Sequence, residues 1–206
     1  MKQILATVNA AAALAGGAAS AATITSLVGD IDGFGGQTTP NAVGADTGFG
    51  FNNRTGSDPV FTDVWLFEQQ GGVAGSPVEY SHSYSLAAGQ SVVSATLIIM
   101  ESGMSDERGP WDVLVNGTVV GNIPVGGADL ESLSVLYVFN VIADLLTGGN
   151  ESISLVYQDT ADEGYAIDYS LLSVETVPLP ASLPLLVGAL GGLGLLRRRR
   201  PMGRSS

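Results

Sequence analysis

Near its middle the chain has an Asn-Gly pair between two apolar runs, an arrangement that a β-hairpin accommodates and a helix does not. Trp111 to Val115 and Thr118 to Ile123 flank Asn116-Gly117. A type I′ turn needs positive φ at both central residues, and Asn-Gly is one of the pairs that adopt this conformation readily. The sequence therefore predicts an antiparallel hairpin over residues 111–123.

The same kind of patterning predicts further strands. Val78 to Leu86 alternates, with His82 on the apolar face beside valine, tyrosine and leucine, and serine or glutamate on the other face. Val92 to Met100 is apolar on both faces, which favours a central strand covered on both sides. Five other stretches are rich in β-branched or aromatic residues: 22–28, 60–67, 133–141, 152–157 and 165–175. Residues 142–146 fit either a helical turn or the end of a strand.

These stretches predict an all-β fold. About eight or nine strands are separated by Gly-rich turns, and no long segment has the 3.6-residue period of an amphipathic helix. The fold class expected is an antiparallel β-sandwich of the jelly-roll type. The chain has no cysteine, so disulfides, cysteine-ligated zinc and thiol nucleophiles are excluded.

Gly29 to Asp58 is a long segment rich in Gly, Asn, Asp and Thr. It has few apolar side chains to bury, so a loop is expected rather than a helix or strand. A loop of this length is unusual and is often functional or ordered by a bound metal.

The first 21 residues have the organisation of a secretory signal peptide, for which a signal helix is expected. Lys2 provides the positive start, an apolar run follows to Ala15, and Ala19-Ser20-Ala21 is a small-x-small cleavage site. Cleavage there makes Ala22 the first residue of the mature chain. The expected β-sandwich domain then spans residues 22–176.

The C-terminal residues 177–206 contain three elements in a fixed order. A proline motif comes first, Val177-Pro178-Leu179-Pro180-Ala181. The uncharged run Leu179 to Leu196 has 18 residues, which as a helix covers about 27 Å and just spans a hydrocarbon core. Four arginines follow: Arg197, Arg198, Arg199 and Arg200. Such a positive cluster stays on the cytoplasmic side, so the preceding body is expected outside the cytoplasm.

This tail resembles the VPLPA-CTERM sorting signal, a variant of the PEP-CTERM class of exported proteins in Gram-negative bacteria. The resemblance covers about 30 of 206 residues. It implies that an exosortase, a membrane cysteine protease, cuts near the proline motif. The transmembrane helix would then hold the chain in the inner membrane only until processing, and the product would reach the cell surface or the extracellular space. The alternative is an ordinary C-terminal membrane anchor.

The charges of the chain are strongly segregated. Between leader and tail lie Arg54, Arg108 and all 20 acidic residues, so the body has a formal charge of −18. Such a body cannot bind nucleic acid by neutralising phosphates, nor dock on an anionic lipid surface. Its acidity fits either solubility alone or the binding of divalent cations.

The body carries a second resemblance. The strands around "WDVLVNGTVVG" and "YAIDYSLLSV" resemble those of carbohydrate-binding and galactose-binding-like jelly rolls. Members of those groups often have a late Asp-Tyr/Phe strand and a structural calcium, and Ile167-Asp168-Tyr169 occupies that place. The resemblance implies that the body binds glycan or calcium.

Several aspartates are candidate metal ligands. Asp30-x-Asp32-Gly33 alternates carboxylates before a glycine, but an EF-hand is excluded because Phe34 stands at position five and no glutamate at position twelve. A looser site can combine Asp30 and Asp32 with Asp63 or Asp168; the alternative is a solvated acidic turn. Asp168 lies between apolar neighbours, and a buried carboxylate there must be paired or bind a metal.

The sequence gives no local support for catalysis. His82 is the only histidine, and we expect it to be a hydrogen-bonded structural residue. There is no G-x-S-x-G motif, and one histidine cannot build a His-rich zinc site. Acidic loop residues near 106–108 and 159–163 could supply the two carboxylates of a glycosidase, so that function remains an alternative. Trp65, Trp111, Tyr80 or Tyr84 would stack on sugar rings if they are exposed.

Two functions follow from these observations. The first is a non-catalytic surface or extracellular-matrix protein that binds glycan, such as exopolysaccharide, or calcium. Its partners would be the exosortase and the export machinery. The second is a secreted hydrolase that acts on polysaccharide.

Overall fold

The computed structural model describes residues 21–67, 78–105, 110–127, 130–158 and 164–179. Residues Ala21–Val177 form one compact unit. The second unit, Met1–Ser20 with Pro178–Ser206, lies almost wholly outside the described ranges, as do the expected signal helix and transmembrane helix. Among the residues that are described, no helix has the length and hydrophobicity needed to cross a membrane.

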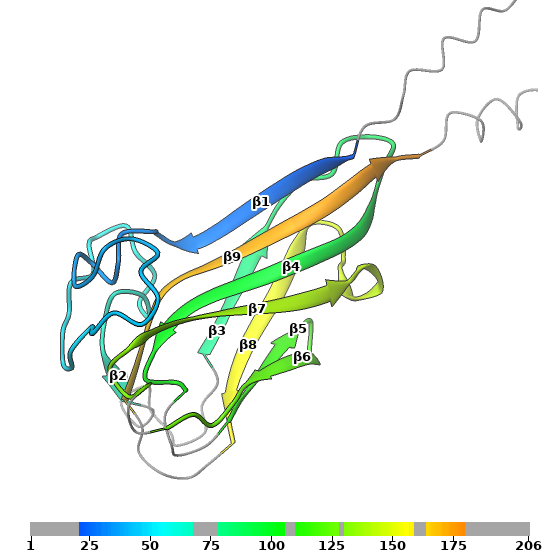
Figure 1. Cartoon of the computed structure of the whole chain (residues 1–206). Coiled ribbons are helices and arrows are strands. Elements are labelled where there is room, and N and C mark those ends of the chain that lie inside the picture. The colour runs from blue at the N-terminus through cyan, green and yellow to red at the C-terminus, as the bar shows by residue number, and fades with distance from the viewer. Residues whose placement is uncertain (1–20, 68–77, 106–109, 128–129, 159–163, 180–206) are drawn as a thin grey trace, which may run out of the picture. The chain divides into compact units, whose positions relative to one another are not determined.

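The body consists of two antiparallel β-sheets (Figure 1). The first has the order β1-β9-β4-β7, and the short β2 also pairs with β9; the second has the order β3-β8-β5-β6. The strands are β1 (Ala22–Gly29), β2 (Leu66–Phe67), β3 (Val78–Ser83), β4 (Gln90–Ser102), β5 (Trp111–Val115), β6 (Thr118–Ile123), β7 (Ser134–Ile142), β8 (Asn150–Tyr157) and β9 (Gly164–Pro178). From β3 onward most connections cross between the sheets, which is the connectivity of a jelly roll and confirms the expected fold class.

The hairpin expected around Asn116-Gly117 is present with the expected boundaries. Asn116 has φ 50° and Gly117 has φ 78°, as a type I′ turn requires, and Val115 pairs with Thr118. One register irregularity follows between Val113 and Leu114. The single turn of 3-10 helix, Ala143–Leu145, agrees with one of the two readings of residues 142–146.

The main hydrophobic core lies between the two sheets. β4 contributes Leu97 and Ile99, and β5 contributes Trp111 and Val113, all fully buried. From β9, Ile167 and Leu172 point into the same core. β4 and β9, at the centre of the first sheet, are apolar on both faces over part of their length because a long loop covers the outer face there.

That loop connects β1 to β2 and has its own small core. Phe34, Phe51 and Trp65 pack against Met100 of β4 and Tyr169 of β9. In Figure 1 the loop is the blue and cyan trace at one end of the sheet. It lacks regular secondary structure, as expected for residues 29–58, and its isolated bridges are Asp46 to Leu133, Asn52 to Val64 and Thr62 to Ile167.

Two strand predictions were wrong in extent. Residues 60–67 form a strand only at Leu66–Phe67, because Asp63 has the left-handed φ of 55°, which interrupts an extended strand. The strand expected over 78–86 ends at Ser83, after which Tyr84 hydrogen-bonds to the Gly149 carbonyl outside the ladder. β9 continues to Pro178, two residues beyond the expected end of the domain.

Candidate metal centre

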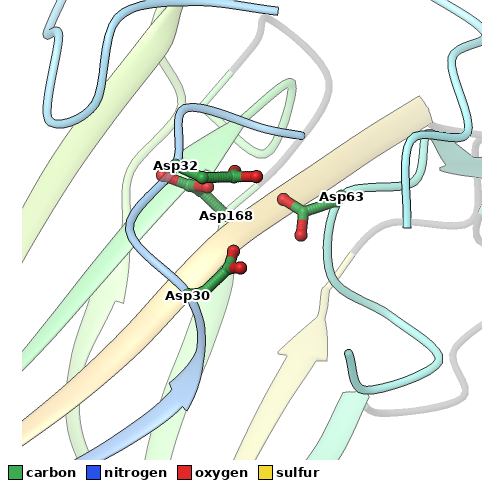
Figure 2. Close-up of side chains that lie close together, drawn as sticks. All are labelled: Asp30, Asp32, Asp63 and Asp168. Atoms are coloured by element: carbon green, nitrogen blue, oxygen red, sulfur yellow. The ribbon is translucent and has the colours of Figure 1, made fainter. Parts of the chain in front are cut away.

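Four aspartates that are distant in sequence converge at the end of β1. Asp30, Asp32, Asp63 and Asp168 each offer a carboxylate oxygen, and these atoms all lie within 4.8 Å of one another. Figure 2 shows the four side chains turned toward a common centre. Asp30 and Asp32 begin the long loop, Asp63 lies near its end, and Asp168 belongs to β9. These are the four residues that the sequence suggested as metal ligands.

The close approach of β1 to β9 places Asp30 beside Asp168. Gly29 pairs with Tyr169 and has φ +80°, a conformation that side chains other than glycine rarely adopt. A Cβ atom on Gly29 would lie 2.5 Å from the Asp168 carbonyl oxygen. Glycine at position 29 therefore allows the chain to leave the sheet directly above Asp168.

The turn after Asp32 fixes two of the carboxylates through backbone hydrogen bonds. The Phe34 N–H donates to Asp168 Oδ1 at 2.8 Å, and the Gly35 N–H donates to Asp32 Oδ1 at 2.7 Å. Gly33, Phe34 and Gly35 all have positive φ, so the backbone curls and directs successive N–H groups toward the carboxylates. The Phe34 side chain is anchored in the loop's small core.

The backbone also holds Asp63 in place. Its N–H donates to the Ile167 carbonyl at 2.9 Å, and its carbonyl accepts from the Asn53 N–H at 2.9 Å. Thr62 bridges to Ile167, the neighbour of Asp168 on β9. The loop thus returns to the sheet beside the residue that its beginning also contacts.

The cluster contains buried carboxylate oxygens without partners. Asp63 is 1% exposed and Asp168 is fully buried, whereas Asp30 and Asp32 are half-buried. Both oxygens of Asp63, Oδ2 of Asp168 and Oδ1 of Asp30 have no hydrogen-bond partner. In the described part of the chain the only arginine is Arg54, and no ion pair joins it to these carboxylates.

Burial and mutual repulsion raise the proton affinity of the cluster. The pKa of Asp63 rises to about 8, first because burial disfavours its charged form and then through repulsion by Asp32, Asp168, Asp30 and Asp58. Burial also raises the pKa of Asp168 to about 6, although the hydrogen bond from Phe34 opposes this shift. The pKa of Asp30 is raised by burial and by Asp32 and Asp58.

Two other buried carboxylates in the protein, by contrast, accept hydrogen bonds from protein donors. Glu151 is fully buried, yet it accepts hydrogen bonds from Tyr84, Asn116, Thr147 and Gly148. Burial alone would raise its pKa, but these donors outweigh burial and lower it. Glu101 likewise accepts from the Met104 N–H and the Ser105 hydroxyl. The fold can therefore satisfy a buried carboxylate with its own donors, whereas at the aspartate cluster both oxygens of Asp63, Oδ2 of Asp168 and Oδ1 of Asp30 receive none.

The arrangement suits a hard divalent cation. Ca²⁺ takes about six to eight oxygen ligands at roughly 2.3–2.6 Å, and a cation at the common centre would neutralise the charges that now repel. The cluster has no histidine or cysteine, the ligands that zinc prefers.

His82 has no part in this cluster. It is fully buried on β3, where Nδ1 lies 3.2 Å from Ser26 Oγ and Nε2 lies 3.0 Å from Ser170 Oγ. The Tyr80 hydroxyl donates to the same Ser170 oxygen at 3.0 Å. This is the structural, hydrogen-bonded histidine that the sequence predicted.

The aromatic residues considered as sugar platforms belong mainly to the core. Trp65 is 6% exposed, Trp111 is fully buried and Tyr80 is 9% exposed. Tyr84 is half-buried, and its hydroxyl donates to Glu151. Phe49, which was not among the aromatic residues considered from the sequence, is 57% exposed. It packs edge-on against Trp65 with 5.1 Å between ring centroids. A Phe in a Gly-rich loop gave no sequence signal for this position.

Several other candidate residues lie outside the described ranges. These are the acidic loop residues near 106–108 and 159–163, the cleavage-site Ala19, and Pro180, Ala181 and Arg197 to Arg200 of the tail. Ala21, Ala22, Val177, Pro178 and Leu179 are described: Ala22 begins β1, and β9 ends at Pro178. Ala22 pairs with Thr176, so the body begins and ends on adjacent strands.

Comparison with known proteins gives fold likenesses only. No family model matches the chain, and no curated protein matches it. Among solved structures, a CBM35 from Cellvibrio japonicus Abf62 is 17% identical, with TM-score 0.42, covering 72% of this chain and 92% of that chain. A family 35 carbohydrate binding module from an environmental isolate is 18% identical, with TM-score 0.41, covering 64% of this chain and 88% of that one.

A third similar structure is the CBM36-1 domain of a multidomain xylanase from the hindgut metagenome of Trinervitermes trinervoides. It is 16% identical, with TM-score 0.39, covering 73% of this chain and 96% of that one. Likeness at this level of identity and TM-score carries no information about what the present chain binds.

Proposed function

We propose that this chain is an exported, non-catalytic β-sandwich protein whose body binds one calcium ion through Asp30, Asp32, Asp63 and Asp168. The observation that supports this is the convergence of four carboxylates within 4.8 Å, two of them fully buried, without a cationic partner among the described residues. Unpaired buried charge is strongly unfavourable, and a bound cation removes the penalty.

Calcium fits the cluster better than the other common divalent ions. Zinc favours nitrogen and sulfur ligands, which the cluster lacks. Magnesium requires near-ideal octahedral geometry and keeps several waters, whereas two of these carboxylates are closed off from solvent. Extracellular calcium modules bind with dissociation constants of about 10⁻⁴–10⁻³ M, and an exported protein would work in that range.

The raised pKa values also suit a general acid, which is the chemistry of the alternative function, a polysaccharide hydrolase. A general acid must touch its substrate. Asp63 and Asp168 are 1% and 0% exposed, so a sugar cannot reach them without a rearrangement of the loop. Burial therefore favours ion binding over acid catalysis at this site.

The export part of the proposal depends on the sequence. The leader ending at Ala21 and the tail from Val177 to the arginine cluster support passage across the inner membrane, processing by an exosortase and release to the surface or matrix. Mass spectrometry of the secreted form tests this, with termini expected at Ala22 and near the proline motif. Recovery of the intact chain from the cytosol would contradict it.

Calcium titration by isothermal calorimetry tests the ion site. The full chain is expected to bind one calcium ion, and Asp168→Asn to bind at least tenfold more weakly. Asp46→Asn is the matched control, because Asp46 lies in the same loop but outside the cluster and accepts only the Gly48 N–H. Absence of calcium binding at millimolar concentration, or an equal loss of affinity in Asp46→Asn, would contradict the proposal.

Glycan binding is the further role that the matrix assignment suggests. Retention on an exopolysaccharide column without release of reducing sugar would support it. Release of reducing ends that disappears when one acidic loop residue is replaced by alanine would instead favour the hydrolase.

A further inference from the structure

Three of the four aspartates of the cluster lie at the two ends of one long loop, and the fourth lies on the sheet. Asp30 and Asp32 follow directly after β1, Asp63 lies three positions before the start of β2, and Asp168 lies on β9, with which both β1 and β2 pair. Any ion held by all four carboxylates therefore ties the beginning of the loop to its end and both to β9. We call residues 30–65 the clasp segment.

The clasp segment has no regular secondary structure to hold it in one conformation. It contains no helix and no named strand. Besides isolated bridges, hydrogen bonds connect its residues 41–47 to Ser102, Ser132, Ser134 and Tyr169. Gly33, Gly35, Gly36, Gly44, Gly48 and Gly50 all have positive φ, as do Phe34, Asn41 and Asp63. A glycine-rich backbone loses much conformational entropy when it is fixed, so its order needs a strong tether.

Without a cation, the cluster opposes that order. Repulsion among the four aspartates is increased by Asp58, which also belongs to the clasp segment. The attractions that remain are the small core of Phe34, Phe51 and Trp65 on Met100 and Tyr169, and the hydrogen bonds that hold residues 41–47. Those hydrogen bonds do not reach the residues around Arg54. Of the clasp segment only Phe61, which is partly buried, packs against the main core, so nearly all of the core between the two sheets lies outside the segment.

We propose that calcium acts as a conformational clasp: it orders segment 30–65 on the sandwich, and its removal releases the segment while the two sheets stay folded. This inference depends on the calcium site proposed above and adds its consequence. The surface that the segment presents, with exposed Val43, Phe49 and Val60, then exists only in the calcium-bound protein. A chain that meets calcium only after export would acquire this surface outside the cell.

Arg54 provides a natural reporter of the clasp. It is exposed and lies in the segment, and the body contains only one other trypsin site, Arg108. The residues around it are held by hydrogen bonds from Asn53 to the Phe34 carbonyl at 3.1 Å and from the Thr55 hydroxyl to Asp58 at 2.7 Å. Cleavage needs local unfolding of such a segment, so its rate follows the population of the open form.

The test is trypsin digestion of the full chain in calcium and in excess chelator, with cleavage after Arg54 measured by mass spectrometry. A disordered peptide substrate in the same tube corrects for any effect of calcium on trypsin. Cleavage after Arg54 is expected to be at least tenfold faster in chelator. Asp32→Asn is expected to lose the protection by calcium, and Asp46→Asn to keep it.

Trp65 gives a second readout. The chain has two tryptophans, and Trp111→Phe leaves Trp65 as the only one, packed against Phe49 and Phe51. Its emission should shift to longer wavelength in chelator, while far-UV circular dichroism keeps the β-sheet signal.

The outcomes separate this inference from the calcium site itself. If calorimetry shows calcium binding but Arg54 is cut at the same rate with and without calcium, the clasp is wrong and the ion site stands. If the β-sheet signal is lost in chelator, or if Asp46→Asn loses the protection too, the clasp is also wrong. If calcium does not bind at all, both proposals fail.

Discussion

The backbone N–H of Phe34 donates a 2.8 Å hydrogen bond to Asp168 Oδ1, across 134 positions of sequence. This bond joins the start of the long loop to the last strand of the sandwich. It satisfies one oxygen of Asp168 and leaves Oδ2 buried without a partner, facing Asp30, Asp32 and Asp63. A cation between those carboxylates would remove the cost of burying them together.

Replacing Asp63 by asparagine should have opposite effects with and without calcium. In chelator at pH 7 the buried Asp63 carboxyl must either take up a proton or carry a repelled charge, and Asp63→Asn removes that cost. The free energy of unfolding should therefore rise by about 1–2 kcal/mol after allowance for solvent screening. In calcium at 100 times its dissociation constant, the wild type should gain about 2.7 kcal/mol that the variant lacks. Urea unfolding in both conditions measures the two differences.

Glu151→Gln is the matched control for that variant, because Glu151 is a buried carboxylate satisfied by protein donors. The new amide N–H₂ would face donors, so a loss of about 1–3 kcal/mol is expected in calcium and in chelator alike. A calcium-dependent effect in Glu151→Gln, or equal effects of Asp63→Asn in both conditions, would contradict the assignment.

Calcium affinity should increase with pH. In the metal-free protein the pKa of Asp63 is raised to about 8 and that of Asp168 to about 6, so at pH 7 the folded cluster holds about one proton that calcium must displace. The same shifts imply that metal-free stability falls as pH rises from about 4 to 8, since the folded state binds more protons than the unfolded state.

Calorimetry at pH 7 in two buffers with different ionisation enthalpies measures that proton release directly. About one proton per calcium ion is expected, and the apparent affinity should rise roughly tenfold from pH 6 to 7. Binding heats that are identical in both buffers would contradict the pKa assignments of the cluster.

The sequence predicted the fold class and named four aspartates that the structure brings together, but it did not reveal what positions them. Alternation and the Asn-Gly turn predict strands because both depend on local geometry. The pairing of β1 with β9, from opposite ends of the body, has no local signal. The left-handed conformation of Asp63 depends on hydrogen bonds to Ile167 and Asn53, so residues 60–67 were predicted as a strand.

Burial of Asp168 was foreseeable and its degree was not. Apolar neighbours at 167 and 169 indicated a carboxylate in an apolar strand. Asp168 is fully buried because the long loop folds over it. No pattern in residues 29–58 predicts where that loop lies. The role of Gly29 similarly becomes evident only from its distance to the Asp168 backbone.

Gly29→Ala should weaken both the fold and the ion site. The new Cβ would lie 2.5 Å from the Asp168 carbonyl oxygen, and alanine at this position would have to adopt φ +80°. The end of β1 must therefore move away from β9. A lower melting temperature and at least tenfold weaker calcium binding are expected. Gly36→Ala is the matched control. Gly36 has φ +87°, so alanine there is strained in the same way, but the added Cβ would have no heavy atom within 4 Å and would cause no steric clash. Equal losses of calcium affinity in the two variants would contradict the positioning role of Gly29.

His82 should stay neutral well below the usual range. Burial lowers its pKa to about 4, and the hydrogen bond to Ser26 opposes the shift only in part. Because the unfolded state takes up this proton near pH 6.5, stability is lost as pH falls from about 6.5 to 4. His82 is the only histidine, so its ring resonance can be followed by NMR without ambiguity. A titration midpoint near 6.5 in the folded protein would show that the ring is accessible to solvent.

The most direct test of the central claim is a crystal structure grown in millimolar calcium, with diffraction measured where calcium scatters anomalously. If the cluster binds calcium, one anomalous peak is expected about 2.3–2.6 Å from carboxylate oxygens of Asp30, Asp32, Asp63 and Asp168. A cluster without a peak at saturating calcium, or a peak only at other residues, would contradict it.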